Sequence, residues 1–289
     1  MNDRIIKELE INLSKSDNQK SSCWKHELDG ADYYNIYLNI GFGGYTKIKL
    51  HKIPIHFLFQ RLIFGNKIFK TKEYHVFKKM CYLQNRQLDV DVIRHIFNFN
   101  LLNKHNLLKN NICLIGDGKA NFVGGLLVMN KKDIKIFSIN LTEVLIHDYL
   151  MIRNINLIDD ESIIVVKNEK DLDTPNKKLF LIDASNSHLL KNKNINLFVN
   201  LSSMQEMRPE IVEDYFQIIK SNSAYFYCEN RKYKKLIGGE ELIFSQYPWG
   251  NCRTILSGDC PWHERCYSSK PPFIGKMDGP YKHALVKYS

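Results

Sequence analysis

From residue 110 onward, short apolar runs alternate with longer stretches that have helical spacing. The runs read ICLI, IKIFSI, IIVV, LFLI, LFVNL and YFYC, and the clearest helical stretches are TEVLIHDYLMIRNI (142–155) and RPEIVEDYFQIIKSN (208–222). Continuous apolar runs indicate strands that are buried on both faces. Their alternation with helices predicts an α/β unit with a mostly parallel sheet covered by helices on both faces. Residues 157–197 hold two strand candidates with little helix between them, so the pattern is least defined there.

The first third of the chain has a different pattern. Residues 1–50 are mixed and rich in aromatic side chains, which favours short strands or irregular structure. Residues 52–105 place apolar side chains at intervals of three and four, which predicts helices. We therefore divide the chain into a mixed or helical accessory region, 1–108, serving as a lid or facing the substrate, and a sheet domain, 109–289, with a loop-rich C-terminal extension.

The charge and the apolar runs limit the classes of partner. The chain carries 41 lysine and arginine residues against 31 acidic ones, a formal charge of +10, but it contains no run of five basic residues. We therefore do not expect nucleic acid binding. The positive charge would also suit a substrate that carries negative charge. The longest apolar run, residues 53–64, is too short for a membrane span and includes His56, Gln60 and Arg61. The N-terminus has no apolar signal region, so we expect a cytoplasmic protein. The sequence does not indicate its oligomeric state.

A glycine bend, Gly116-Asp117-Gly118, follows the first strand of the predicted sheet. Ligands of open α/β sheets bind at the carboxyl ends of the strands, where glycines let the backbone approach them. Asn121 stands where a dinucleotide fingerprint would have its third glycine. The bend is therefore either a cradle for a nucleotide-like cofactor or a plain turn between a strand and a helix.

The second strand ends at Asn140, 24 residues after Gly116. An acidic residue at this position would accept hydrogen bonds from ribose hydroxyls, and an amide can make the same bonds without a charge. The alternative is a turn that only leads into the next helix, which Thr142 is placed to cap.

Several motifs in this domain resemble one family. INLTEVL (139–145) resembles the turn after the second strand of class I S-adenosylmethionine-dependent methyltransferases, which have a Rossmann-like sheet. NLFVNLSSMQEMRPEIVEDYFQII, with Asn200, Gln205 and Glu206, is similar to the sugar O-methyltransferases within that class. YFYCENRKYK and SQYPW continue the similarity, which covers about residues 110–250. The glycine bend is poorer than is usual in the family, and Asn140 replaces an acidic residue.

The resemblance implies S-adenosylmethionine as the cofactor and methyl transfer to a hydroxyl of a sugar, nucleotide-sugar or glycan, as in surface polysaccharide biosynthesis. It also implies roles for individual residues. The cofactor-binding set is Gly116, Asp117, Gly118, Asn140, Leu141, Asp183, Ala184 and Asn200. The catalytic candidates are Glu206, Gln205, His188 and His263, and the substrate-binding candidates are Asn230, Arg231 and Trp249. We expect Glu206 to lie near a helix N-terminus, which would lower its pKa and keep it ionised.

Two other function classes stay open. The poorer glycine bend and Asn140 are also compatible with a methyltransferase-like module that binds a glycan without catalysis. A Rossmann-fold oxidoreductase is the third reading, and the missing third glycine counts against it. The C-terminal motif CPWHERC, with Cys252 ahead of Cys260, His263 and Cys266, supplies four ligand types that zinc accepts, but we assign no metal because the spacing is irregular.

Overall fold

The computed structural model describes residues 3–13, 17–37, 47, 49–129, 134–267 and 272–289. Its principal helices are α1 (Arg4–Glu10), α3 (Ser22–Leu28), α4 (Ile53–Phe64), α5 (Lys72–Leu83), α6 (Val90–Lys104), α7 (Asn121–Met129), α8 (Thr142–Ile155), α9 (Glu169–Leu172) and α10 (Pro209–Ser221). Within these residues, none of the helices combines the length and the apolar character needed to cross a bilayer.

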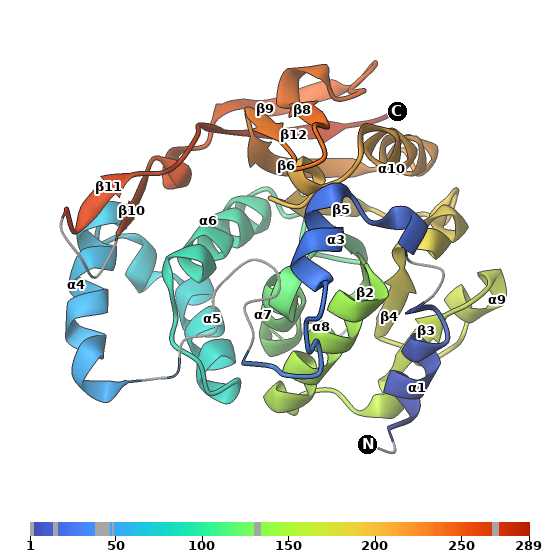
Figure 1. Cartoon of the computed structure of the whole chain (residues 1–289), viewed down its shortest axis with the longest axis horizontal. Coiled ribbons are helices and arrows are strands. Elements are labelled where there is room, and N and C mark those ends of the chain that lie inside the picture. Colours follow the sequence, from blue (N-terminus) through green and yellow to red (C-terminus); the bar gives the residue numbers. More distant parts are fainter. Residues whose placement is uncertain (1–2, 14–16, 38–46, 48, 130–133, 268–271) are drawn as a thin grey trace.

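One large sheet organises the molecule (Figure 1). Its strand order is β3-β4-β2-β1-β5-β6-β12-β9. The bounds are β3 (Ile163–Val166), β4 (Leu179–Asp183), β2 (Lys135–Asn140), β1 (Asn111–Ile115), β5 (Leu197–Leu201), β6 (Tyr225–Arg231), β12 (Tyr281–Lys287) and β9 (Arg253–Asp259). The strands from β3 to β6 run parallel, whereas β12 is antiparallel to both of its neighbours. The predicted Rossmann-like α/β fold is confirmed.

Alternate residues of the parallel strands enter two separate hydrophobic cores. In β1, Ile112 and Leu114 join the core shared with α5, α6, α7 and α8, while Cys113 and Ile115 join the core shared with α10. A strand whose neighbouring residues are both buried has to be covered on both faces. This is the physical reason for the continuous apolar runs in the sequence.

The chain reverses its direction of strand addition at β1. β2 pairs with β1 on one side, and β5 pairs with it on the other. Open α/β sheets bind ligands in the crevice outside the carboxyl ends of the strands at such a switch point. Ile115, Asn140 and Leu201 end the three strands concerned, so the loops after these residues define where a site is expected.

Both ends of the chain depart from the sequence prediction. Residues 1–50 were expected to be strands or irregular, but the described part contains α1 and α3, because the side chains of Asp3 and Ser21 cap these helices by accepting hydrogen bonds from backbone N–H groups. The remainder of that stretch, residues 38–46 and 48 above all, lies outside the described residues. The C-terminal extension, expected to be loop-rich, contributes β9 and β12 to the sheet and the small β10 (Arg265–Tyr267)–β11 (Ile274–Lys276) hairpin. A second small hairpin joins β7 (Tyr233–Lys235) to β8 (Glu241–Ile243).

Candidate functional site

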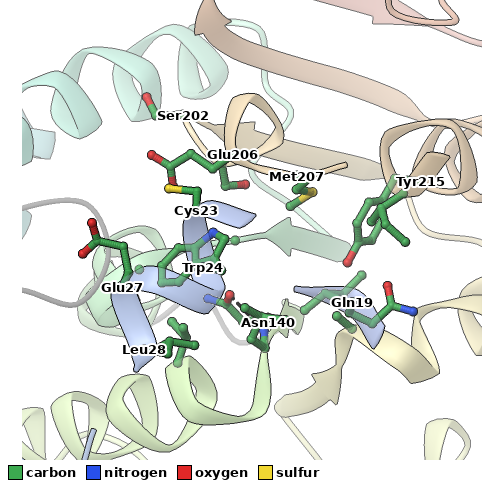
Figure 2. Close-up of a pocket in the computed structure, with 18 of the residues that line it drawn as sticks. Gln19, Cys23, Trp24, Glu27, Leu28, Asn140, Ser202, Glu206, Met207 and Tyr215 are labelled. Atoms are coloured by element: carbon green, nitrogen blue, oxygen red, sulfur yellow. Dashed lines mark hydrogen bonds between the residues drawn. The ribbon is translucent and has the colours of Figure 1, made fainter. Parts of the chain in front are cut away.

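A cavity of about 290 Å³ lies at the carboxyl ends of β1, β2 and β5, at the switch point (Figure 2). Its walls come from the sheet, from the loop after β5, from α10 and from α3. The lining residues are Gln19, Cys23, Trp24, Glu27, Leu28, Gly116, Gly118, Ile139, Asn140, Leu141, Val144, Ala184, Leu201, Ser202, Ser203, Glu206, Met207, Ile211 and Tyr215. Six of the residues assigned from the sequence are among them: Gly116, Gly118, Asn140, Leu141, Ala184 and Glu206.

The glycine at the end of β1 is required by its neighbours. Gly116 has a φ of +72°, and a Cβ at this position would lie 2.2 Å from Ser203 Oγ. Ser203 Oγ donates to the carbonyl oxygen of Ile115 at 2.8 Å, and Asn200 Nδ2 donates to the same oxygen at 2.9 Å. The ends of β1 and β5 are therefore locked together, and only glycine leaves room for that contact.

Asp117 has a structural role rather than the cofactor-binding role that was assigned to it. Its two carboxylate oxygens accept hydrogen bonds from the backbone N–H groups of Phe122 and Val123 in α7, at 2.9 and 2.7 Å. Burial raises the pKa of Asp117 to about 6, although the α7 hydrogen bonds act in the opposite direction. The bend is thus a capped strand-to-helix turn and also, through Gly116 and Gly118, part of the cavity wall.

Asn140 reaches the cavity from the end of β2. Its Nδ2 donates to Asp148 Oδ2 of α8 at 3.2 Å, and its Oδ1 accepts from the N–H of Leu141 at 3.1 Å. Asp148 Oδ1 accepts from Ala120 N–H at 2.9 Å, and burial raises the pKa of Asp148 well above its usual range. An amide at position 140 therefore donates a hydrogen bond to a buried carboxyl group, which an ionised acidic side chain at this position could not do.

Thr142 does not cap α8, although its position suggested this. Its hydroxyl donates instead to Asp183 Oδ2 at 2.5 Å. Asp183 also accepts from the backbone N–H and the hydroxyl of Ser185, so its carboxylate is used within the fold. Asp183 does not line the cavity, whereas the next residue, Ala184, does.

α3 forms a wall of the cavity from a distant part of the sequence. Four residues of this helix line the cavity: Cys23, Trp24, Glu27 and Leu28. In Figure 2 the Trp24 ring lies between Asn140 and Glu206. Ser21 Oγ donates to the carbonyl oxygen of Glu206 at 2.5 Å, which fixes the start of the helix against the loop after β5. The sequence analysis placed a lid in this region but named none of these residues. The Ser21-Ser22 pair ahead of Trp24 is a capping signal that could have indicated a helix here.

Glu206 lies in the short 3₁₀ helix Met204–Glu206, two residues before Arg208, the N-cap of α10. It is not in the first turn of α10, so the expected lowering of its pKa is wrong. Burial raises the pKa of Glu206 to about 7; Lys234 lowers it and Glu27 raises it further. A carboxyl group with this pKa exchanges a proton near neutral pH.

Ser202, which the sequence analysis missed, is a buried residue of the cavity wall in a left-handed conformation, with a φ of +60°. Its hydroxyl has no hydrogen-bond partner among the described residues, although its backbone N–H donates to the carbonyl oxygen of Glu229 at 2.7 Å. Non-glycine residues with strained backbone gather at functional sites, and buried hydroxyl groups seldom stay unpaired. Ser202 is therefore a candidate for hydrogen bonding to a ligand.

Asn200, Gln205 and Asn230 form a buried network beneath the cavity rather than part of its lining. Asn230 Nδ2 donates to Asn200 Oδ1 at 2.8 Å, and Asn230 Oδ1 accepts from the N–H of Gln205 at 3.1 Å. Gln205 Oε1 accepts from the N–H of Arg231 at 2.7 Å, while its Nε2 donates to the hydroxyl of Tyr281 at 3.2 Å. These residues link the ends of β5, β6 and β12, which explains the motif spacing without a catalytic role for Gln205.

The remaining substrate-binding candidates also lie off the cavity. Arg231 pairs with Asp278 at 3.0 Å and lies over the ring of Tyr281. Trp249 packs edge-on against Phe216, with ring centroids 5.1 Å apart, and donates its Nε1 hydrogen to the carbonyl oxygen of Phe244. Neither residue is in the cavity lining.

Neither candidate histidine lines the cavity. His188 is exposed, and its Nδ1 lies 3.0 Å from the carbonyl oxygen of Ser185. His263 is buried, with Nε2 2.7 Å from Glu229 Oε1 and its ring stacked on Tyr281 at 3.9 Å. Burial alone would raise the pKa of Glu229, but His263, Trp262 and Cys260 together lower it to about 2.

The sequence suggested that Cys252, Cys260, His263 and Cys266 could share a metal. Among the described residues, the structure instead groups Cys260 and His263 with Glu229, with ligand atoms within 4.8 Å of one another. Glu229 accepts hydrogen bonds from Trp262 Nε1 at 2.6 Å and from Cys260 Sγ at 3.2 Å. The four-residue set is therefore not assembled, and the hydrogen bonds account for the buried carboxylate.

No protein-family model and no curated protein sequence matches this chain. Among solved structures, an S-adenosylmethionine-dependent methyltransferase from Clostridium acetobutylicum ATCC 824 is similar, with a TM-score of 0.43 and 14% identity over 75% of this chain and 98% of that one. A SAM-dependent methyltransferase from Aquifex aeolicus has a TM-score of 0.40 and 12% identity over 76% and 100% of the two chains. The mitomycin 7-O-methyltransferase MmcR is similar with a TM-score of 0.40 and 9% identity, over 97% of this chain and 67% of that one. With TM-scores below 0.5, these similarities carry no argument about the activity of this chain.

Proposed function

We propose that this protein is an S-adenosylmethionine-dependent O-methyltransferase that transfers a methyl group to a hydroxyl of a sugar, nucleotide-sugar or glycan. The observation that carries the proposal is the chemistry of the cavity at the switch point. Among the described residues, its lining contains two acidic side chains, Glu27 and Glu206, and no lysine, arginine or histidine, although the chain as a whole has a formal charge of +10. A cavity of this kind favours a ligand that carries positive charge.

The residues present fit S-adenosylmethionine, whose sulfonium and ammonium groups outweigh its single carboxylate and give it a net positive charge. Gly116 and Gly118 allow a close approach of the backbone, and Asn140 offers an amide for ribose hydroxyls. Trp24 and Leu28 supply apolar surface for a purine ring. A nicotinamide dinucleotide carries a pyrophosphate instead, for which the described part of this lining offers no cationic side chain, so the oxidoreductase reading is disfavoured.

Bound S-adenosylmethionine would supply an electrophilic methyl group. The chain itself has to position a hydroxyl and accept its proton, and Glu206 is suited to both tasks. A general base works best when its pKa lies near the working pH, and the pKa of Glu206 is raised to about 7 by burial. Ser202 adds to the cavity wall a buried hydroxyl that has no hydrogen-bond partner among the described residues. These two residues favour catalysis over the binding-module alternative.

The region before residue 109, expected from the sequence to serve as a lid or to face the substrate, takes part in this proposal as a lid. α3 brings four side chains to the cavity, and its Trp24 lies opposite the end of β2 (Figure 2). We therefore place α3, within the accessory region 1–108, over the cofactor, and we keep the division between residues 108 and 109 as part of this proposal.

Calorimetric titration tests the cofactor. We expect S-adenosylhomocysteine to bind and NADH not to bind, and Trp24→Ala to weaken S-adenosylhomocysteine binding by about tenfold, the scale of a lost aromatic contact. Trp249→Ala is the matched control, because Trp249 is also partly buried but does not line the cavity. Binding of NADH alone, or equal losses in the two variants, would reject the proposed cofactor site.

Transfer of labelled methyl groups tests the acceptor. A panel of nucleotide-sugars and polysaccharides is compared with amines and catechols under the same conditions. Methylation of a sugar hydroxyl supports the proposal. If the protein binds S-adenosylhomocysteine but methylates only amines, the sugar assignment is wrong and the cofactor assignment survives.

A further inference from the structure

Away from the cavity, α4 and the β10–β11 hairpin form an exposed apolar surface, which we call the α4 patch. In Figure 1 these elements lie together at the left edge of the molecule. The patch consists of the exposed side chains of Leu50, Ile53, Ile55, Leu58, Leu62 and Phe273. Soluble monomers seldom leave large aliphatic side chains exposed together, so such a patch marks an interaction surface.

The patch follows one face of α4. Ile55, Leu58 and Leu62 stand at helical spacing, and 56%, 56% and 57% of their surfaces are exposed. Phe57 and Phe64, on another face of the helix, pack against the hydrophobic core. α4 therefore has a core side and a second apolar side, on which Ile55, Leu58 and Leu62 remain more than half exposed.

The hairpin fixes the patch from a segment about 200 residues later. The ring of Phe59 stacks on Tyr267 and on Phe273, with centroid distances of 5.8 Å in both cases. His56 Nδ1 lies 2.9 Å from the hydroxyl of Tyr267, and Gln60 Nε2 donates to the carbonyl oxygen of Leu88 at 2.8 Å. The patch is thus held in place by tertiary contacts.

The segment of the chain that carries α4 has charges of one sign. The 40 residues 33–72 contain seven lysine and arginine residues and no aspartate or glutamate. Of these, Lys49, Lys52 and Arg61 lie next to or within α4 and are exposed. Exposed aliphatic side chains beside basic ones are the features by which helices lie on membranes that contain anionic lipids.

We propose that the α4 patch docks the protein on a membrane surface rich in anionic lipid. A second copy of the chain is a poorer occupant, because pairing two such patches would bring two basic segments together with no acidic residue from either. An anionic lipid surface neutralises this charge, while the leucine and isoleucine side chains of the patch insert into the interfacial region of the bilayer. The proposal is independent of the reaction at the cavity.

Co-sedimentation of the full chain with vesicles tests the proposal. We expect the partition coefficient to rise at least about tenfold when about 30 mol % phosphatidylglycerol is added to phosphatidylcholine vesicles, and to fall again at high salt. Leu58→Gln with Leu62→Gln should lower it by about tenfold or more. The control is Ile11→Gln with Ile237→Gln, which changes two apolar residues elsewhere that are at least as exposed as Leu58 and Leu62.

A second pair separates local charge from net charge. Lys49→Glu with Lys52→Glu should lower binding to the anionic vesicles by about tenfold. Lys104→Glu with Lys109→Glu changes the net charge equally at exposed positions outside residues 33–72 and should leave most of the binding intact. Thermal unfolding checks that each variant is folded.

Three outcomes would overturn the proposal. The first is equal binding, or none, to neutral and anionic vesicles. The second is an equal loss in patch and control variants. The third is a dimer, measured by light scattering, that Leu58→Gln with Leu62→Gln dissociates in the absence of vesicle binding, since this would make the patch an interface between two copies.

Discussion

The substitution Asn140→Asp tests why this chain carries an amide where related motifs carry an acid. Asn140 Nδ2 donates to Asp148 Oδ2 at 3.2 Å, and both residues are buried. The substitution replaces that donor with a second carboxyl oxygen at a similar separation. If the acid alone were needed for ribose binding, Asn140→Asp would tighten the cofactor. The structure predicts instead that the fold is destabilised first.

The magnitude follows from the geometry. Two ionised carboxylates 3.2 Å apart repel by about 5 kcal/mol at an effective dielectric constant of about 20. Holding one of them protonated at pH 7 costs about 4 kcal/mol, which caps the penalty. Because the pKa of Asp148 is already raised by burial, part of this cost is present in the unaltered protein. We expect a net loss of about 3 kcal/mol in the free energy of unfolding at pH 7.

The pH dependence and a reciprocal variant complete the test. A carboxyl group whose folded pKa is raised destabilises the fold increasingly as the pH rises above the unfolded value, so the loss should shrink towards pH 4. Urea unfolding at several pH values measures this. Asn140→Asp with Asp148→Asn restores one amide and one acid across the same contact and should recover most of the loss. A variant Asn140→Asp of unchanged stability, with no gain from the reciprocal pair, would refute the reasoning.

Three further predictions use other contacts. Gly116→Ala should lower the free energy of unfolding by about 2 kcal/mol more than Gly65→Ala in a denaturant titration, because both glycines have a φ of +72° but only Gly116 faces Ser203; equal losses would mean that the contact is unimportant. Glu206→Gln should reduce methyl transfer by about 10²-fold and remove the rise of the rate with pH around 7 that the unaltered protein should show; an unchanged pH–rate profile would exclude it as the base. His263→Ala should lower the free energy of unfolding by about 3 kcal/mol at pH 7, because Glu229 loses a buried partner. The stabilisation by this pair is complete above about pH 4 and disappears as the pH falls towards 2, so the free energies of unfolding of the two proteins, measured by acid unfolding, should converge there.

The sheet could be predicted from the sequence because burial on both faces leaves a local mark. The runs around Cys113 and Phe180 are continuous and apolar, since each strand serves two cores. β9 gave no such signal because most of its residues are exposed. β12 is the last strand of the described chain. Its pairing with β6 and β9 depends on contacts between residues that are distant in sequence, so a local pattern does not reveal it.

The site was predictable only in part, for a similar reason. Gly116 and Asn140 follow strands, so their place at the carboxyl edge follows from topology. Whether a polar side chain there faces a ligand or the protein depends on partners elsewhere in the chain, as Asp117 and Gln205 show. Trp24 could not be placed, because nothing local to α3 indicates that it packs over the end of β2.

Because α3 forms one wall of the cavity, it affects how a ligand enters and leaves. This helix has seven residues, and a few hydrogen bonds anchor it, among them Ser21 Oγ to the Glu206 carbonyl and the contacts of Ser22 with Glu240 and Gly238. Such short elements open locally far more often than the whole molecule unfolds. The undocking of α3 can therefore control the entry and exit of a ligand while the sheet stays intact. Ser22→Ala removes contacts that anchor α3 but does not change the cavity lining, so it should shorten the residence time of a ligand in the cavity.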